Sequence, residues 1–196
     1  MIDTAPWPPR SVRAGPISLR AFAGDEAPEL TRLVARNLCH LMPWMPWAAE
    51  PPTLEANEGY VRRTMEEWNA SIGFAYWMRE DESGEMVGCA GLHARPGPGA
   101  LEVGYWVSRD RVRRGYATAS ARALTTVALG IPSISRVEIH CDEANVASAS
   151  VPKRLGYRLD RIEDERADAP GETGRTMIWV VGTETWVTST SSGPTP

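Results

Sequence analysis

Residues 107–118 of this chain read VSRDRVRRGYAT, and this segment decides the expected fold. It leaves an apolar strand pattern, turns through four arginines and one glycine, and begins a helical pattern. A helix N-terminus carries unpaired N–H groups and a positive partial charge, so phosphate groups bind there. Gly115 lets a ligand approach the backbone closely, Ala117 adds no bulk, and Thr118 offers a hydroxyl in the first turn. The segment predicts an anion site, although a basic turn before a helix also occurs as a merely solvated surface.

The hydrophobic periodicity changes between strand and helix on both sides of this turn. The segment 74–107 predicts an antiparallel meander, whereas strand, helix and strand over 101–141 require a parallel crossover. The chain is therefore expected to be an α+β (α/β) domain with a mixed, largely antiparallel sheet of six to seven strands and about four helices. The expected strands are 17–22, 74–79, 85–93, 101–107, 136–141, 157–164 and 176–181, and the expected helices are 25–39, 53–69, 115–129 and 145–155.

The two ends of the chain differ in composition from its middle. Prolines crowd residues 1–16, and residues 183–196 form a polar run, TETWVTSTSSGPTP. Neither stretch carries enough apolar residues to bury much surface. Both are therefore predicted to be flexible segments that flank one domain over residues 17–182.

Composition narrows the function classes. The chain has 196 residues and a net charge of −4, which argues against a general nucleic-acid binder. No apolar run is long enough for a membrane span, and the N-terminus lacks the apolar run of a secretory signal, so a cytoplasmic location is expected. The three cysteines, Cys39, Cys89 and Cys141, form no CxxC pair, so neither a disulfide framework nor a zinc site is predicted.

Five segments, taken together, resemble one family. The run RGYAT at 114–118 resembles the pyrophosphate loop of the GNAT acetyltransferases, in particular the RimJ/RimL-type branch. Four further segments agree with that branch in order and spacing, and the resemblance covers about residues 17–181. These segments are LR at 19–20, LMPWMPW at 41–47, LEVGYWV at 101–107, and NVAS at 145–148 followed by KRLGY at 153–157.

The resemblance implies an acetyl-CoA-dependent N-acetyltransferase that needs no metal. The cofactor would lie where the strand at 101–107 splays from its parallel neighbour, with the pantetheine arm pairing to the backbone of Trp106 and Val107. Asn145 would hold that arm, cap its own helix, or do both. Val112 stands where the family usually has Gln or Arg, which implies weakened cofactor binding. The residues implied to hold the pyrophosphate are Arg113, Arg114, Gly115, Tyr116, Ala117 and Thr118.

Two residues are candidates for acid and base chemistry. Glu102 would lie in a central strand, where a carboxylate is costly unless it is exposed, paired or used. The resemblance favours a general base, and the alternatives are a residue that only orients the acceptor ammonium or one at a wet sheet face. The family's usual acid, a tyrosine, aligns with Pro152, so Ser148 becomes the candidate acid. Its alternative role is a helix-start serine bonded to backbone, and Pro152 should free the Ser148 carbonyl.

The sequence defines the residues that would bind the acceptor less clearly than those that would bind the cofactor. Trp44 and Trp47 are candidate walls of an acceptor pocket or, alternatively, simple core filling. The acidic residues of 163–165, with Asp168 and Glu172, would attract a cationic acceptor or form a solvated loop. Cys141 is interpreted as structural, because His140 beside it in the strand would point to the opposite face.

The acceptor itself stays open between two amines. One is a protein N-terminus of the ribosomal-protein type, and the other is a small primary amine. A different class of function is a non-catalytic module or regulatory subunit that binds CoA on the same fold. An edge strand would permit a homodimer, which no residue pattern establishes.

Overall fold

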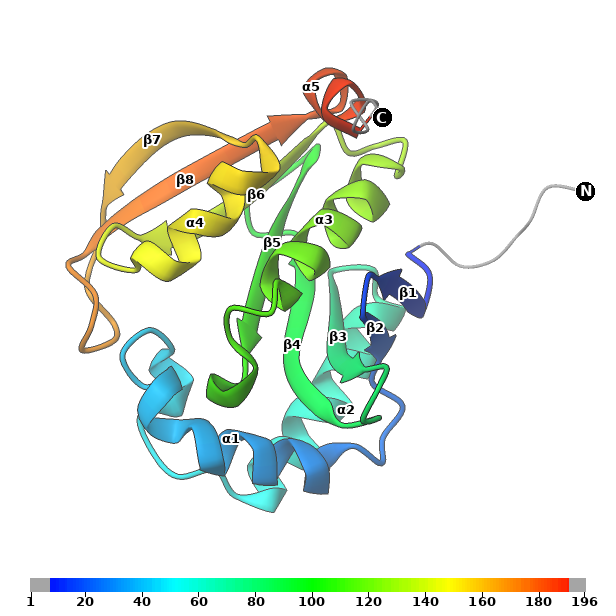
Figure 1. The fold of residues 1–196 in the computed structure, drawn as a ribbon, viewed down its shortest axis with the longest axis vertical. Helices are drawn as coiled ribbons and strands as arrows, with labels where there is room; N and C mark the ends of the chain where they lie inside the picture. The colour runs from blue at the N-terminus through cyan, green and yellow to red at the C-terminus, as the bar shows by residue number, and fades with distance from the viewer. Residues whose placement is uncertain (1–7, 191–196) are drawn as a thin grey trace, which may run out of the picture.

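The arginine-rich turn joins β5 (Ala100–Val107) to α3 (Tyr116–Leu129), and β6 (Arg136–Asp142) follows as a strand parallel to β5 (Figure 1). A computed structural model describes residues 8–190 of the chain. The turn contains a short 3-10 helix, η2 (Arg109–Arg111), and four residues separate η2 from the start of α3. The parallel crossover predicted over residues 101–141 is therefore confirmed.

The other strands extend the sheet in antiparallel pairs on both sides of β5 and β6. The sheet order is β1-β2-β3-β4-β5-β6-β8-β7, in which β5 and β6 are the single parallel pair among the described strands. This confirms the mixed, largely antiparallel architecture. The remaining strands are β1 (Ser11–Ala14), β2 (Ile17–Ala21), β3 (Gly73–Glu80), β4 (Met86–His93), β7 (Arg158–Asp164) and β8 (Arg175–Gly182).

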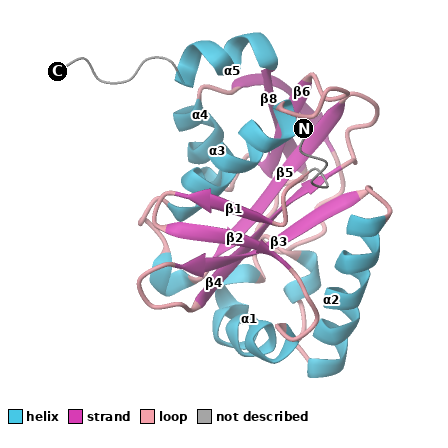
Figure 2. Ribbon diagram, turned by 90° about the vertical axis from the view of Figure 1, so that its right-hand side faces the viewer, coloured by secondary structure: helices cyan, strands magenta, loops and turns pink. Residues whose placement is uncertain are grey.

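Helices cover the two faces of the sheet with separate cores (Figure 2). The α1/α2 face carries α1 (Ala27–Leu41) and α2 (Leu54–Asn69), and α2 begins as predicted at Thr53, whose Oγ1 accepts the N–H of Ala56 at 3.1 Å. The α3/α4 face carries α3 and α4 (Val146–Leu155). Ala121 and Ala128 of α3 are fully buried, so small side chains let α3 lie close to the sheet.

Two segments expected to be flexible form regular structure instead. Ser11–Ala14 pair with β2 as β1, which raises the strand number to eight. Thr183–Thr190 form α5, whose Trp186 is 4% exposed and meets the Tyr157 ring at 6.2 Å. One buried indole therefore holds a helix that its polar neighbours would not hold alone. The rest of both expected segments, 1–7 and 191–196, lies outside the described residues.

Within the described residues 8–190, no helix is both long and apolar enough to cross a membrane.

Candidate functional site

The parallel pair separates soon after it begins. β5 and β6 pair over only three positions, ending at Glu102 opposite Glu138. On the β4 side, by contrast, β5 is paired as far as Val107. The β6 side of β5 beyond Glu102 therefore has no strand partner and offers its backbone groups to an extended ligand. Trp106 and Val107 lie on this stretch, the first half-buried and the second buried.

The arginine-rich turn ends in a bare helix start. Gly115 is the N-cap of α3 with φ of +81°, and no side chain caps it. The first intrahelical bond runs from Ala119 N–H to the Gly115 carbonyl at 2.8 Å, so the N–H groups of Tyr116, Ala117 and Thr118 precede the helix ladder. A Cβ at Gly115 would meet nothing within 4 Å, so the space beside Gly115 is open. This geometry suits an anion at the head of α3.

A buried carboxylate, that of Glu80, contacts several side chains of the arginine-rich turn. Glu80, at the end of β3, is 5% exposed and accepts a short hydrogen bond from the Tyr116 hydroxyl. Its oxygens also lie 3.3 Å from Arg111 Nε, 3.3 Å from Arg114 Nη1 and 2.7 Å from Ser83 Oγ. The hydrogen bonds from Tyr116 and Ser83 lower the pKa of Glu80 despite its burial.

This anchoring changes what the predicted cofactor residues can do. The Tyr116 side chain is buried against Glu80, so only its backbone N–H faces the open side. Arg114 is half exposed and already paired. Arg113 is exposed, has a φ of +61° and takes part in no ion pair among the described residues, which leaves its charge for a ligand.

A second buried network ties the turn to α1. Asn37, 2% exposed, donates from Nδ2 to Ser108 Oγ at 2.9 Å and accepts the Arg109 N–H at 2.8 Å. Ser108 Oγ also donates to Asp110 Oδ1 at 2.6 Å. Because Asn37 lies 71 residues from Ser108, the sequence pattern carried no sign of this link.

Glu102 lies on the α1/α2 face with 9% of its side chain exposed. Arg95 Nε lies 3.2 Å from Glu102 Oε2, and His140 Nδ1 lies 4.0 Å from the same oxygen. The His93 ring lies beside it, in room left by Gly104, where a Cβ would meet His93 Nε2 at 3.4 Å. Glu102 is therefore buried and paired, as its strand position required.

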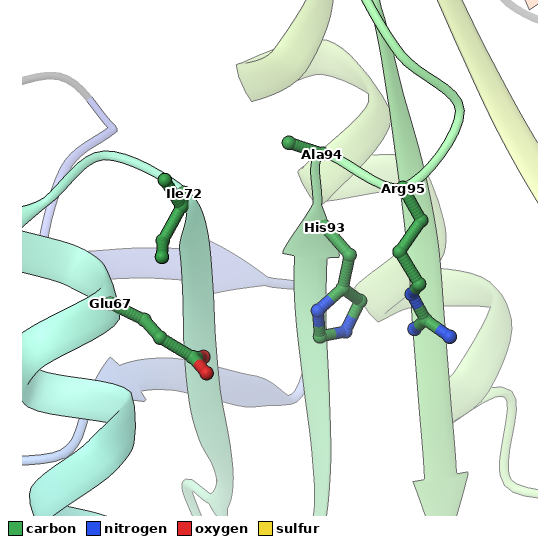
Figure 3. A pocket seen from close by; sticks show the side chains of 5 residues that line it. All are labelled: Glu67, Ile72, His93, Ala94 and Arg95. Atoms are coloured by element: carbon green, nitrogen blue, oxygen red, sulfur yellow. The ribbon is translucent and has the colours of Figure 1, made fainter.

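The cavity next to this group is lined by charged side chains of opposite sign. Glu67 of α2, Ile72, His93, Ala94 and Arg95 surround a cavity of about 400 Å³ (Figure 3). The side chains of His93 and Arg95 lie side by side on one wall of the cavity, and that of Glu67 lies on the opposite wall. Burial, followed by the Arg95 charge, lowers the pKa of His93 to about 4, so its ring is neutral near pH 7.

The candidate acid lies on the opposite face. Ser148 belongs to the first turn of α4, and its N–H is capped by Asn145 Oδ1 at 3.0 Å. The Tyr105 hydroxyl lies 3.3 Å from Ser148 Oγ and donates to the Ser148 carbonyl at 3.2 Å. That carbonyl lacks the usual helical donor because Pro152, four residues on, has no N–H. Burial raises the pKa of Tyr105 well above its usual range.

Sequence reasoning missed Tyr105 and His140 as site residues. Strand alternation in LEVGYWV already put Tyr105 opposite Glu102, but the contact to Ser148 spans 43 residues. Asn145 caps α4 as one of its two predicted roles. Cys141 is buried on the α3/α4 face, and burial raises its pKa to about 11, which suits an inert thiol.

The loop at residues 41–47, which carries Trp44 and Trp47, lies against the loop between β7 and β8. The Gly171 N–H donates to the Pro43 carbonyl at 2.9 Å, so the two loops touch at the edge of the α1/α2 face. Trp47 is 54% exposed and its ring lies 6.1 Å from that of Trp106, whereas Trp44 is half-buried. Trp47 is thus available to a ligand, and Trp44 contributes partly to packing.

The acidic residues of this region have local partners. Glu163 pairs with Arg161 at 2.6 Å, and Asp164 with Arg175 at 3.3 Å. The remaining carboxylates bond to a hydroxyl, an arginine and backbone N–H groups: Glu165 to Thr176, Asp168 to Arg166, and Glu172 to the N–H groups of residues 168 and 169. In the described part of the chain, no group of three or more His, Cys, Asp and Glu side chains is arranged to hold a metal ion.

Comparison with known proteins gives a family match. The model of the family described as acetyltransferase (GNAT) domain matches residues 17–158. YjdG of Bacillus subtilis, an uncharacterized N-acetyltransferase, is 28% identical over 108 residues, which cover 54% of this chain and 64% of YjdG. The matched segment therefore spans less than two thirds of that relative.

YdaF of Bacillus subtilis, a putative ribosomal N-acetyltransferase, is 26% identical over 147 residues, which cover 72% of this chain and 77% of YdaF. Among solved structures, RimL, a ribosomal L7/L12 alpha-N-protein acetyltransferase in complex with coenzyme A, superimposes with a TM-score of 0.80. Its identity is 20%, and the alignment covers 89% of this chain and 99% of RimL. At this identity the likeness shows the fold.

Proposed function

Because this chain belongs to the acetyltransferase (GNAT) domain family, we propose that it transfers the acetyl group of acetyl-CoA to a primary amine. We propose further that the amine is the N-terminus of a protein. The observation that carries the proposal is the pairing of a bare helix start at Gly115 with a strand pair that separates after Glu102. The first suits a diphosphate and the second suits an extended arm.

The residues that would hold acetyl-CoA lie along one path. The N–H groups of residues 116–118 and the charge of Arg113 would bind the diphosphate. The unpaired side of β5 would bind the pantetheine arm, and acetyl-CoA would supply a thioester that an unprotonated amine attacks. The open space at Gly115 and the unpaired backbone beyond Glu102 fit that group.

Glu102 is the proposed base on the acceptor side. An amine is protonated near pH 7, so it must lose a proton before it attacks a carbonyl. The Arg95 guanidinium at 3.2 Å holds the place that an acceptor ammonium would take, and Arg95 is 65% exposed on a loop rich in proline and glycine, so it can yield. Ser148, with the Tyr105 hydroxyl, is the proposed proton donor on the other face.

The acceptor class rests on two observations. Trp47 is exposed beside Trp106, and the cavity at Arg95 has opposite charges across it, which suits a peptide with its amides and charged end. YdaF and RimL, to which this chain is similar, carry ribosomal acetyltransferase names. Both support a protein N-terminus over a small amine.

The test uses radiolabelled acetyl-CoA with a panel of N-terminal peptides and a panel of small amines. We expect label on peptides, and Glu102→Gln should lower kcat by about 100-fold or more while thermal protection by CoA persists. Label on small amines alone would contradict the acceptor class. CoA binding without transfer to any amine would favour a non-catalytic CoA-binding module.

A further inference from the structure

Glu102 has little direct contact with solvent. Its side chain is 9% exposed, and the Arg95 guanidinium lies against Oε2. A base that takes a proton from each acceptor must release it before the next turnover. A neighbouring group that is more exposed than Glu102 offers the proton a second way out, and the ionisable side chains recorded close to Oε2 are those of Arg95 and His140.

His140 is placed to receive that proton. Its Nδ1 lies 4.0 Å from Glu102 Oε2, and its Nε2 lies 2.6 Å from Glu138 Oε2. The three residues share one face because Glu102 is in register with Glu138 and His140 is two residues further along β6. The His140 side chain is 26% exposed, against 9% for Glu102, so His140 has the wider contact with solvent.

Glu138 fixes which ring nitrogen is available. A neutral imidazole has one N–H donor and one acceptor nitrogen. The 2.6 Å contact to the carboxylate of Glu138, which is 1% exposed, favours N–H at Nε2. Nδ1 then carries the lone pair and faces Glu102.

We propose that His140, held by Glu138, receives the acceptor's proton from Glu102 and delivers it to solvent, an inference that rests on the proposed function. The ammonium N–H bond breaks and a Glu102 O–H bond forms. When Oε2 and Nδ1, which lie 4.0 Å apart, approach to hydrogen-bond distance, that O–H bond breaks as Nδ1–H forms, and the imidazolium then loses its proton to water. The net reaction of a protonated amine with a thioester gives amide, thiol and one free proton, which matches this release. His140 and Glu138 are positioning residues that act through Glu102.

The charges around His140 are compatible with both states of the ring. Arg136 Nε lies 2.7 Å from Glu138 Oε1, so the two oxygens of Glu138 contact two different basic side chains, Arg136 and His140. Arg95 faces Glu102 rather than the ring. Across β6, the residue opposite His140 on β8 is the apolar Ile178, and on β7 Arg161 is bound to Glu163 and Asp160. A proton arriving at Nδ1 therefore meets Glu138 as its balancing charge.

The experiment compares His140→Ala with Glu138→Gln and with His40→Ala, a partly exposed histidine in the last turn of α1 that serves as control. Each variant is tested for thermal protection by CoA and for transfer to the amines that the wild type acetylates. We expect His140→Ala to lose about 100-fold in kcat with unchanged KM for acetyl-CoA. Added imidazole should restore its kcat, because the side chain leaves a space that opens to solvent. Glu138→Gln should lose less, and Glu102→Gln should not respond to imidazole.

Two results would overturn the relay. One is a kcat of His140→Ala within twofold of the wild type, and the other is a loss of kcat that imidazole does not restore, which would assign a structural role. Both are distinguishable from failure of the proposed function, in which the wild type itself acetylates no amine and the relay falls with it.

Discussion

Replacement of Glu80 by Gln tests whether the arginine-rich turn, the proposed diphosphate site, depends on a buried charge. Gln keeps the size of the side chain but removes the charge that meets Arg111, Arg114 and the Tyr116 hydroxyl. Removing one partner of a buried ion pair typically costs about 3–5 kcal/mol. Arg111 keeps Asp110 at 2.7 Å and Glu85 at 3.1 Å, so we expect the lower end, about 3 kcal/mol. For a chain of this length that lowers Tm by roughly 6–12 °C.

The pH dependence of this difference has a defined sign. The pKa of Glu80 is lower in the folded protein than its ordinary value. Its contribution to stability is therefore complete above the ordinary carboxyl pKa and is lost as pH falls through the depressed folded value. Gln does not titrate, so the stability gap between wild type and Glu80→Gln should close as the solution is acidified.

Thermal unfolding at neutral and acidic pH measures both effects. The matched control is Glu85→Gln, because Glu85 contacts the same Arg111 but is 54% exposed and should cost less than about 1 kcal/mol. We also expect weaker protection by CoA in Glu80→Gln, since Arg114 and Tyr116 lose their anchor. Equal losses in the two variants, or a gap that does not change with pH, would refute the reasoning.

Three further substitutions separate the parts of the site. Gly115→Glu should abolish thermal protection by CoA, because a carboxylate would repel the phosphates and because φ of +81° at this residue disfavours any side chain. Retained protection would show that the diphosphate binds elsewhere. Tyr105→Phe should lower kcat about tenfold without changing KM for acetyl-CoA, as expected from the loss of one hydrogen-bond donor to Ser148, and an unchanged kcat would remove Tyr105 from the chemistry. Trp47→Ala should raise KM for the acceptor with little change in Tm, since the ring is exposed, whereas a large fall in Tm would mean that it fills the core.

Local patterns were enough to predict most of the helices and strands and the turn that precedes α3. Hydrophobic periodicity located the strands and helices of residues 17–181, and Thr53 and Gly115 marked helix starts, because these signals come from neighbours within a few residues. The sequence did not predict β1 and α5 as regular elements. Their composition is polar. The helix α5 is held by contacts such as Trp186 on Tyr157, a residue distant in the sequence, and β1 is held by its pairing with β2 at four positions.

The tertiary structure alone decided how the chemical groups meet. The sequence indicated that Glu102 and Pro152 are unusual at their positions, but not which residues meet them. Strand register and strand separation bring His140 and Glu138 to the Glu102 side of the sheet. They also bring Tyr105 to the Ser148 carbonyl, which lacks a helical donor because of Pro152. Periodicity specifies which face a side chain takes. The distance between two side chains on different strands depends on register and twist, which form only when the whole sheet assembles.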